Sequence, residues 1–412
     1  MVQVIHERCA GLDIHKKTVV VTIMITGSDG TVQELTRSFP TMTSDLLKLE
    51  DWLSRHQIQV IAMESTGVYW RPVFNLLEEG REVLLVNAQH MKAVPGRKTD
   101  VKDSQWLADL LRHGLLKASF IPPQPVRDVR DLMRYRKTLV QQRATEVNRV
   151  QKVLETANIK LSSVASDVMG KSGRDMIEGV IAGQEDHEVL AELARGSLRG
   201  KREDLRKALE GRVKPHHRLL LKHLLDHLDF LDATLLSLEK EIEPYVSPFS
   251  EAMTLVQSIM GVGETAAASI IAEIGADMSR FPSEKHLASW AGVSPGNKQS
   301  GGKRLSGKTT KGNGNLRSAL YEVAWVISRM KGNFLSSFYH RLVRRIGKKK
   351  AITALAHKVL VVIYHVLQTK KPYEDLGADF FDQQDQERIQ RHHISRLEHL
   401  GYTVTLIPKE VA

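Results

Sequence analysis

Cys9-Ala-Gly-Leu-Asp13 and Val60-Ile-Ala-Met-Glu64 are two short apolar runs that each end in a carboxylate. Such runs predict buried strands, so each acid is expected at the end of a strand and at one edge of a sheet. Asp100 and Asp103 stand three residues apart at the start of a helical pattern, and side chains at that spacing share a helix face. The sequence therefore predicts four acids at one edge of an α/β sheet.

Carboxylates gathered in this way are typical ligands of Mg²⁺, which prefers oxygen donors and often shares its site with substrate phosphates. Two such ions can hold the attacking and leaving oxygens of a phosphodiester. Asp13, Glu64, Asp100 and Asp103 are therefore the predicted metal ligands and catalytic acids. Acids at strand ends and helix starts also serve as ordinary caps and turn formers, which is the alternative for each of them taken singly.

The first 117 residues alternate between strand and helix patterns. We expect a hairpin of strands 18–26 and 31–39, later strands at 57–63 and 83–86, and helices at 43–55, at 68–79 and after residue 100. Three strands followed by helix, strand, helix, strand and helix is the order of an RNase H-like domain. A sugar-kinase-like or actin-like ATPase also has an Asp after its first strand, but it needs a glycine there for close approach to phosphate. Ile14 follows Asp13 here, which argues against nucleotide binding.

Pro122, Pro123 and Pro125 mark a boundary, after which the pattern is that of long helices. Apolar residues then recur at steps of three and four, as in the seam of a coiled coil or helical hairpin: Leu221, Leu224, Leu228, Leu231, Leu235, Leu238 and Ile242. Val140, Val147 and Leu154 predict a partner helix that packs within the chain or pairs between subunits. Residues 160–200, which include Gly170, Gly173, Gly179 and Gly183, are predicted to be a loop-rich interruption.

Several segments are candidates for contact with phosphates. Residues 127–152 hold eight basic and three acidic residues, which fits either a solvated helix face or a phosphate-tracking one. Gly261 and Gly263 resemble a helix-hairpin-helix turn, which binds DNA phosphate through backbone N–H groups; a glycine cap between packed helices is the alternative. The loop 295–317 has no acid and six basic residues: Lys298, Lys303, Arg304, Lys308, Lys311 and Arg317. A further basic run includes Lys348, Lys349 and Lys350.

The composition indicates a globular chain with polyanionic partners. It has 412 residues, of which 42% are hydrophobic, and 59 Lys and Arg against 48 Asp and Glu give a formal charge of +11. One cysteine excludes an intramolecular disulfide framework, and no signal-peptide pattern precedes the first strand. The apolar runs 19–25 and 359–367 are too short to span a membrane. We therefore expect a cytoplasmic protein with no membrane partner.

Seven motifs together resemble the DEDD insertion-sequence transposases, over nearly the whole chain: Gly11-Leu-Asp13 with Lys16, Met63-Glu64-Ser-Thr-Gly67, Lys98-Thr-Asp100-Val-Lys-Asp103, Gly261-Val-Gly263, Ala291-Gly-Val-Ser-Pro295, Ser300-Gly-Gly-Lys303 and Gly312-Asn-Gly-Asn-Leu-Arg317. The resemblance implies that the four acids bind Mg²⁺ and that Ser300 attacks DNA to form a transient phosphoserine link. It also implies a bridging RNA that pairs with donor and target DNA. Family members often carry a second serine beside the nucleophile, where this chain has Gln299; Ser294 and Ser306 are the nearest other serines in the loop.

The resemblance further implies that the acids of one subunit meet the serine of another, so a homodimer or homotetramer would form through the helical arm. We expect four segments: an RNase H-like domain (1–120), a coiled-coil arm (121–250), a mainly helical serine-bearing domain (251–375) and a C-terminal tail (376–412). The expected activity is DNA recombination for an insertion sequence in a prokaryotic cell, acting on double-stranded donor and target DNA. Two alternatives stay open: a metal-dependent junction-resolving nuclease that uses water, and a non-catalytic nucleic-acid-binding protein.

Overall fold

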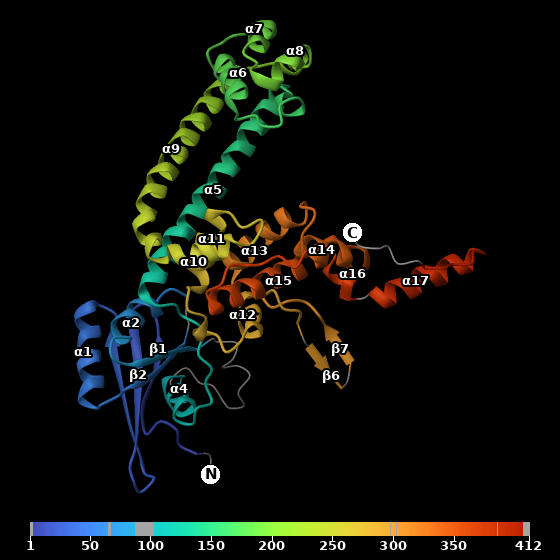
Figure 1. The fold of residues 1–412 in the computed structure, drawn as a ribbon. Coiled ribbons are helices and arrows are strands. Elements are labelled where there is room, and N and C mark those ends of the chain that lie inside the picture. Colours follow the sequence, from blue (N-terminus) through green and yellow to red (C-terminus); the bar gives the residue numbers. More distant parts are fainter. Residues whose placement is uncertain are drawn as a thin grey trace. The chain divides into compact units, whose positions relative to one another are not determined.

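The chain folds into two compact units, Met1–Ile121 and Pro122–Ala412, which we call the N-terminal and C-terminal units (Figure 1). The computed structural model describes residues 3–64, 67–86, 103–296, 298–301, 303–384 and 386–406.

The N-terminal unit is built on a five-stranded mixed sheet with the order β3-β2-β1-β4-β5. β1 pairs antiparallel with β2, and β2 with β3, whereas β1–β4 and β4–β5 are parallel pairs. The strands are β1 (Arg8–Ile14), β2 (Thr18–Thr26), β3 (Val32–Pro40), β4 (Val60–Glu64) and β5 (Glu82–Val86). This arrangement is consistent with the RNase H-like domain expected from the sequence. Gln57 was expected in a strand but has a positive φ of 56°, so β4 begins three residues later.

Helices cover both faces of this sheet. α1 (Thr43–Arg55) and α2 (Trp70–Leu77) pack on one face over Leu12, Ile23 and Met63. α4 (Asp103–Arg112) packs on the other face over Cys9 and Ala62. Because neighbouring strand residues point to opposite faces, Leu12 faces α1 and α2 while Asp13 lies on the α4 side. The fold thus separates the apolar core from the acid-bearing face.

A long helical hairpin begins the C-terminal unit. α5 (Gln124–Thr156) and α9 (Pro215–Val246) pack side by side, and we call this pair the arm (Figure 1). Most of the predicted α9 seam is buried, with Leu225 added to it, while Leu224 and Leu235 are half-buried. Val140 of the predicted partner seam is 42% exposed, and the neighbouring Leu139 is buried in its place. The seam of α5 therefore lies one residue away from the predicted register at that point.

The prediction of a loop-rich interruption at 160–200 is wrong. This segment contains α6 (Lys171–Ile181) and α7 (His187–Glu192). Together with α8 (Arg202–Leu209), which follows the segment, they share an apolar core with the far end of the arm (Figure 1). Two glycines of the segment serve close packing. A Cβ at Gly173 would lie 2.1 Å from the Val168 carbonyl oxygen. A Cβ at Gly179 would likewise lie 2.6 Å from a methyl group of Leu190.

The rest of the C-terminal unit is a helical bundle that carries one small hairpin. Its elements are α10 (Ser250–Gln257), α11 (Glu264–Ile274), α12 (Glu284–Ala291), β6 (Lys298–Ser300), β7 (Lys303–Ser306), α13 (Gly314–Ile327), α14 (Phe334–Ile346), α15 (Lys348–Thr369), α16 (Phe380–Gln384) and α17 (Gln386–His399). Within the described residues, α15 alone is long and apolar enough to cross a membrane, and more than half of its apolar window is buried. Ala351, Leu355 and Val359 are fully buried, so α15 is a core helix of the bundle.

Candidate functional site

Asp13 and Glu64 lie at the same level on neighbouring parallel strands. Leu12 of β1 is paired in register with Met63 of β4, so the next residue of each strand is an acid. Leu12 and Met63 belong to the core under α1 and α2, and alternation therefore places Asp13 and Glu64 on the opposite face. Asp13 is 8% exposed. Two of the four predicted acids thus share one face at one end of the sheet.

α4 brings a third acid toward the same end. A Cβ at Gly11 would lie 2.2 Å from the Ser104 carbonyl oxygen, so only a glycine lets the first turn of α4 approach β1 this closely. The hydroxyls of Thr22 and Ser104 are 2.8 Å apart and buried, which fixes that turn on the sheet. Asp103 precedes Ser104 as the first residue of α4, where the helix dipole favours a negative charge. Asp103 therefore lies next to the strand that carries Asp13.

The fourth acid, Asp100, lies outside the described residues. Within the described part of the chain, His, Cys, Asp and Glu side chains form no group of three or more that could hold a metal ion as placed. The metal site predicted from sequence therefore stays a prediction. Its oxygen-only set of donors fits a hard divalent cation.

His15 is a neighbour of the acids that sequence reasoning missed. Its Nε2 is 3.1 Å from Oδ2 of Asp13, and its side chain is 59% exposed. The sequence could have indicated this contact, because His15 stands two residues after Asp13 and side chains two residues apart on an extended chain point to the same side. An imidazole in this place can donate a hydrogen bond that orients the Asp13 carboxylate.

Ser300 lies at the end of a strand in a short hairpin, where a loop was predicted. Ser300 is paired with Lys303, and Gln299 with Arg304, so β6 and β7 reverse direction directly after the serine. Gly301 has a positive φ of 54° and is exposed. A Gly-Gly pair between two short strands is a recognised hairpin signal, and it could have been found in the sequence. The backbone geometry places Ser300 at the turn of a hairpin that projects from the bundle (Figure 1).

The base of this hairpin is held by close backbone contacts. Gly292, which caps α12 with a φ of 73°, meets Gly312 on the returning leg, and a Cβ at Gly312 would lie 2.4 Å from the Gly292 Cα. A Cβ at Gly296 would lie 2.2 Å from the Lys308 carbonyl oxygen. We call these two glycine contacts the neck. They make the positions of the two legs depend on each other.

The basic residues of the loop differ in their surroundings. Lys303, Lys308 and Lys311 are exposed. Arg317 is half-buried and donates a hydrogen bond to the Lys311 carbonyl oxygen at 3.1 Å. This bond stabilises the loop that leads to α13. The side chains of Lys298, Ser300 and Arg304 lie outside the described part of the structure. Three lysines are thus available to a phosphate on the described surface of the hairpin region.

The basic run on α5 is largely engaged within the chain. Arg136 and Arg143 form ion pairs with Glu239 and Asp232 of α9, which join the two arm helices. Arg149 pairs with Glu146 at 2.5 Å. These ion pairs give the arginines a structural role in the arm that the charge count alone did not indicate.

The two glycines of the predicted helix-hairpin-helix turn have different roles. Gly261 has a φ of 87°, and a Cβ there would lie 2.7 Å from Ile327, so packing against α13 explains this residue. Gly263 caps the N-terminus of α11 with an ordinary φ of −83° and open space around it. The first turn of α11 is therefore the part of this turn that fits an anion contact.

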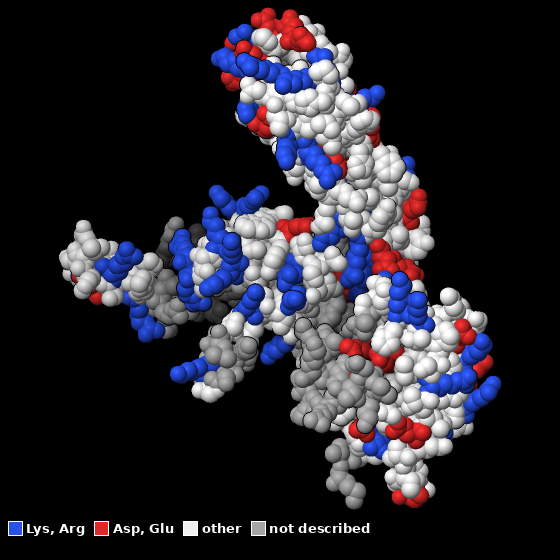
Figure 2. Space-filling model, turned by 180° about the vertical axis from the view of Figure 1, so that it is seen from behind, with Lys and Arg blue, Asp and Glu red and all other residues white. Residues whose placement is uncertain are grey.

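Lys348, Lys349 and Lys350 are exposed in the first turn of α15. Figure 2 shows Lys and Arg side chains gathered over the part of the C-terminal unit that carries α14. Positive side chains at a helix N-terminus face the positive end of the helix dipole, so this turn concentrates positive potential. That potential favours binding of a polyanion.

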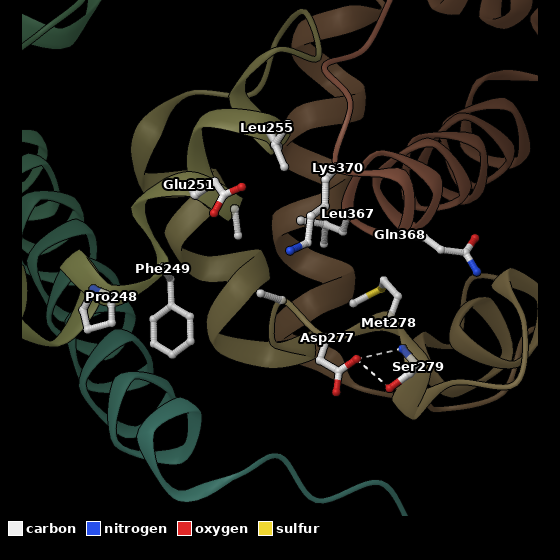
Figure 3. Close-up of a pocket in the computed structure, with 12 residues that line it drawn as sticks. Pro248, Phe249, Glu251, Leu255, Asp277, Met278, Ser279, Leu367, Gln368 and Lys370 are labelled. Atoms are coloured by element: carbon white, nitrogen blue, oxygen red, sulfur yellow. Dashed lines mark hydrogen bonds between the residues drawn. The ribbon is translucent and has the colours of Figure 1, made fainter.

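A pocket of about 520 Å³ between α10 and the end of α15 has the wrong composition for phosphate (Figure 3). Its charged lining residues are Glu251, Asp277 and Lys370, and Asp277 accepts hydrogen bonds from the Ser279 backbone and hydroxyl. Those bonds hold the pKa of Asp277 below its usual range, so the carboxylate is ionised at neutral pH. We assign this pocket no role in DNA chemistry.

Comparison with known proteins identifies the family. A model of DEDD transposases of the IS110 type matches residues 10–159, and the model of the transposase IS116/IS110/IS902 family matches residues 253–340. Together they cover more than half of the chain and include both the acid-bearing strands and the serine hairpin.

Three relatives agree with these matches. The transposase for insertion sequence element IS1111A of Coxiella burnetii is 26% identical over 326 residues, which cover 77% of this chain and 80% of the relative. A probable family 20 transposase of Pseudomonas aeruginosa is 24% identical over 321 residues, or 76% and 85% of the two chains. The pilin gene-inverting protein of Moraxella bovis is 33% identical over 124 residues, or 29% and 38%. The chain belongs to the IS110-type DEDD transposases of the IS116/IS110/IS902 family.

Proposed function

We propose that this transposase cuts and rejoins double-stranded DNA with Mg²⁺ held by Asp13, Glu64, Asp100 and Asp103 and with Ser300 as the nucleophile. The observation that carries the proposal is the register of β1 and β4, which sets Asp13 and Glu64 side by side on the face that α4 covers. An apolar core does not require acids there. A divalent cation that binds a substrate phosphate does require them, because its ligands are oxygen atoms.

The chemistry is a transfer of one phosphodiester bond. The Ser300 oxygen loses its proton and attacks the scissile phosphorus, a Ser–O–P bond forms, the P–O bond to the DNA oxygen breaks, and that oxygen takes up a proton to become a hydroxyl. Reversal with a different DNA hydroxyl rejoins the strand, so no external energy source is needed. A serine hydroxyl is a weak nucleophile at neutral pH and needs activation. Mg²⁺ bound by the acids would supply that activation by polarising the phosphate.

The lysines of the hairpin region would stabilise negative charge on the attacked phosphate. Lys303 is paired with Ser300 across the turn, and Lys308 and Lys311 lie further along the same segment. Ammonium groups near the attacked phosphate stabilise the charge that develops during the transfer. The exposed lysines of α15 and the first turn of α11 would hold the flanking DNA or RNA backbone.

Partners beyond DNA come from the family resemblance. We propose a bridging RNA that pairs with donor and target DNA, and a homodimer or homotetramer formed through the arm, in the cytoplasm of a prokaryotic cell. Exposed apolar residues on α9, among them Phe230 (64%) and Leu236 (58%), support contact between arms, because large exposed apolar groups often mark an interface.

The test uses DNA with a nick or mismatch that blocks resealing. The native protein with Mg²⁺ should accumulate a protein–DNA adduct that survives denaturant, and chelating Mg²⁺ should prevent it. Ser300→Ala should abolish the adduct and recombination, whereas Ser294→Ala and Ser306→Ala are matched controls that should retain at least part of each. Strand cleavage by Ser300→Ala with no adduct from the native protein would favour the junction-resolving nuclease. No cleavage by any form, with DNA still bound, would favour the non-catalytic protein.

A further inference from the structure

Glu273 is a buried carboxylate that the proposed chemistry does not use. It lies on α11, is 3% exposed, and forms a two-point ion pair with Arg134 of α5 at 2.7 and 2.8 Å. Arg130 of α5 approaches the same carboxylate at 3.3 Å and donates to the backbone oxygens of Ala272 and Glu273. A buried charge network of this kind is seldom more stable than apolar packing of equal volume, so its presence needs an explanation.

The third partner of Glu273 is Asn313, the residue that ends the serine-bearing segment. Asn313 donates from Nδ2 to Glu273 Oε2 at 2.7 Å. Its Oδ1 caps α13 by accepting from the N–H groups of Asn315 and Leu316, and its own N–H donates to the Trp290 carbonyl oxygen at 3.1 Å. Capping α13 requires only the oxygen. The bond from the amide nitrogen to Glu273 is therefore additional to what the helix needs.

Asn313 lies at the base of the hairpin. Asn313 follows Gly312, which touches Gly292 in the neck, and the Trp290 oxygen that accepts its N–H lies at the end of α12. Both legs of the hairpin therefore start beside Asn313. Because the neck has no spare room, a shift of Asn313 moves both legs.

We propose that Glu273 and Asn313 are positioning residues that fix the base of the serine-bearing hairpin to arm helix α5. A movement of α5 would reach the hairpin through Arg134, Glu273 and Asn313 in turn. The link to the position of the nucleophile rests on the proposed function of Ser300. The attachment of the hairpin base to α5, which we call the tether, does not depend on that function. The tether can be tested without DNA.

Asn313→Ser separates the two roles of this residue. Serine is a good N-cap, so α13 should still begin normally, but serine has no amide nitrogen to reach Glu273. Asn333→Ser is the matched control: Asn333 caps α14 through its Oδ1 and is 1% exposed, and its Nδ2 has no hydrogen-bond partner among the described residues. The same chemical change there should leave the hairpin alone. Glu273→Gln is a second variant that retains an acceptor for Asn313 and removes the negative charge between the arginines.

The first measurement is amide hydrogen exchange of the two segments that meet in the neck, residues 290–296 and 306–313. It is made on the full chain without DNA. In Asn313→Ser and Glu273→Gln, the amides of these segments should exchange about tenfold faster than in the native protein, or faster still, while those of the arm keep their native rates. In Asn333→Ser, both regions should exchange at native rates. Native exchange rates in the Asn313→Ser neck would overturn the tether. This outcome does not depend on any activity.

The second measurement compares DNA affinity with the rate of adduct formation. Asn313→Ser should bind DNA like the native protein but form the adduct about 10- to 100-fold more slowly, because a small displacement of a reacting group costs that much. A native rate in Asn313→Ser with faster neck exchange would overturn the positioning role. If the native protein forms no adduct, the proposed function fails, and the exchange data still decide the tether.

Discussion

Substitution of Asp13 or Glu64 tests the metal-site proposal. Asp13→Asn and Glu64→Gln keep the shape of each side chain and remove the negative charge that a cation needs. DNA cleavage measured at matched Mg²⁺ should fall about 100-fold or more, while DNA or RNA binding survives.

Glu82→Gln is the matched control for these two variants. Glu82 is exposed at the opposite end of parallel strand β5, so it cannot reach the same cation. Its cleavage rate should equal that of the native protein. Near-native cleavage by both Asp13→Asn and Glu64→Gln would rule out the metal-site assignment.

Sequence patterns were sufficient to predict the places of Asp13 and Glu64, because an apolar run that ends in an acid reports both the strand and its end. Asp103 could be placed at a helix start, but its approach to β1 depends on Gly11, whose lack of a side chain admits α4. That dependence is a tertiary contact between residues more than 90 positions apart, and no local pattern reports it. The role of Glu273 was missed for the same reason, since its partners come from α5 and α13.

The docking of α4 can be followed at the element scale through the single cysteine of the chain. Cys9 is fully buried on the face that α4 covers, and burial raises the pKa of its thiol to about 12. The thiol is therefore protonated at neutral pH and should not react with iodoacetamide at about pH 8 while α4 stays in place.

Gly11→Ala should break this protection. The new methyl group would overlap the backbone of α4 and destabilise the N-terminal unit by about 1–3 kcal/mol. Faster alkylation of Cys9 would report that change. Gly200→Ala, at a glycine with an ordinary φ and open space around it, is the control and should alkylate at the native rate. Equal rates in both variants would contradict the packing of α4 on β1.

The lysines that begin α15 make a separate prediction. Each phosphate contact contributes roughly 0.9 to the slope of log affinity against log salt, so neutralising Lys348, Lys349 and Lys350 should lower the slope by up to about 2.7. Neutralising Lys201, Lys207 and Lys222 on and near the far end of the arm removes the same charge as a control. An unchanged slope for the α15 variant would leave this run as a solvated helix turn.

Element types were predictable where the apolar period was long, as for 43–55, which matches α1 residue for residue. The largest failure involved glycine. The glycines of 160–200 made this segment look like loops, but Gly173 and Gly179 lie inside α6, where the first packs against the turn at Val168 and the second against Leu190 of α7. A glycine can indicate either close packing that leaves no room for a side chain or a turn of the backbone, and the sequence alone does not distinguish the two.

The acids and the serine belong to different compact units of the chain. The chemistry we propose needs both, so its central claim is that a single reaction joins them through a covalent link at Ser300. The family membership of the chain does not depend on this claim, but its mechanism does.

The most direct measurement is the mass of the peptide that carries the link. The protein–DNA adduct formed with Mg²⁺ on resealing-blocked DNA would be purified in denaturant, digested with nuclease and protease, and sequenced by mass spectrometry. We predict a nucleotide attached through phosphate to the peptide that contains Ser300, and no such peptide when Asp13→Asn replaces the native protein. A nucleotide on a peptide without Ser300, or cleaved DNA ends free of protein, would contradict the proposed mechanism.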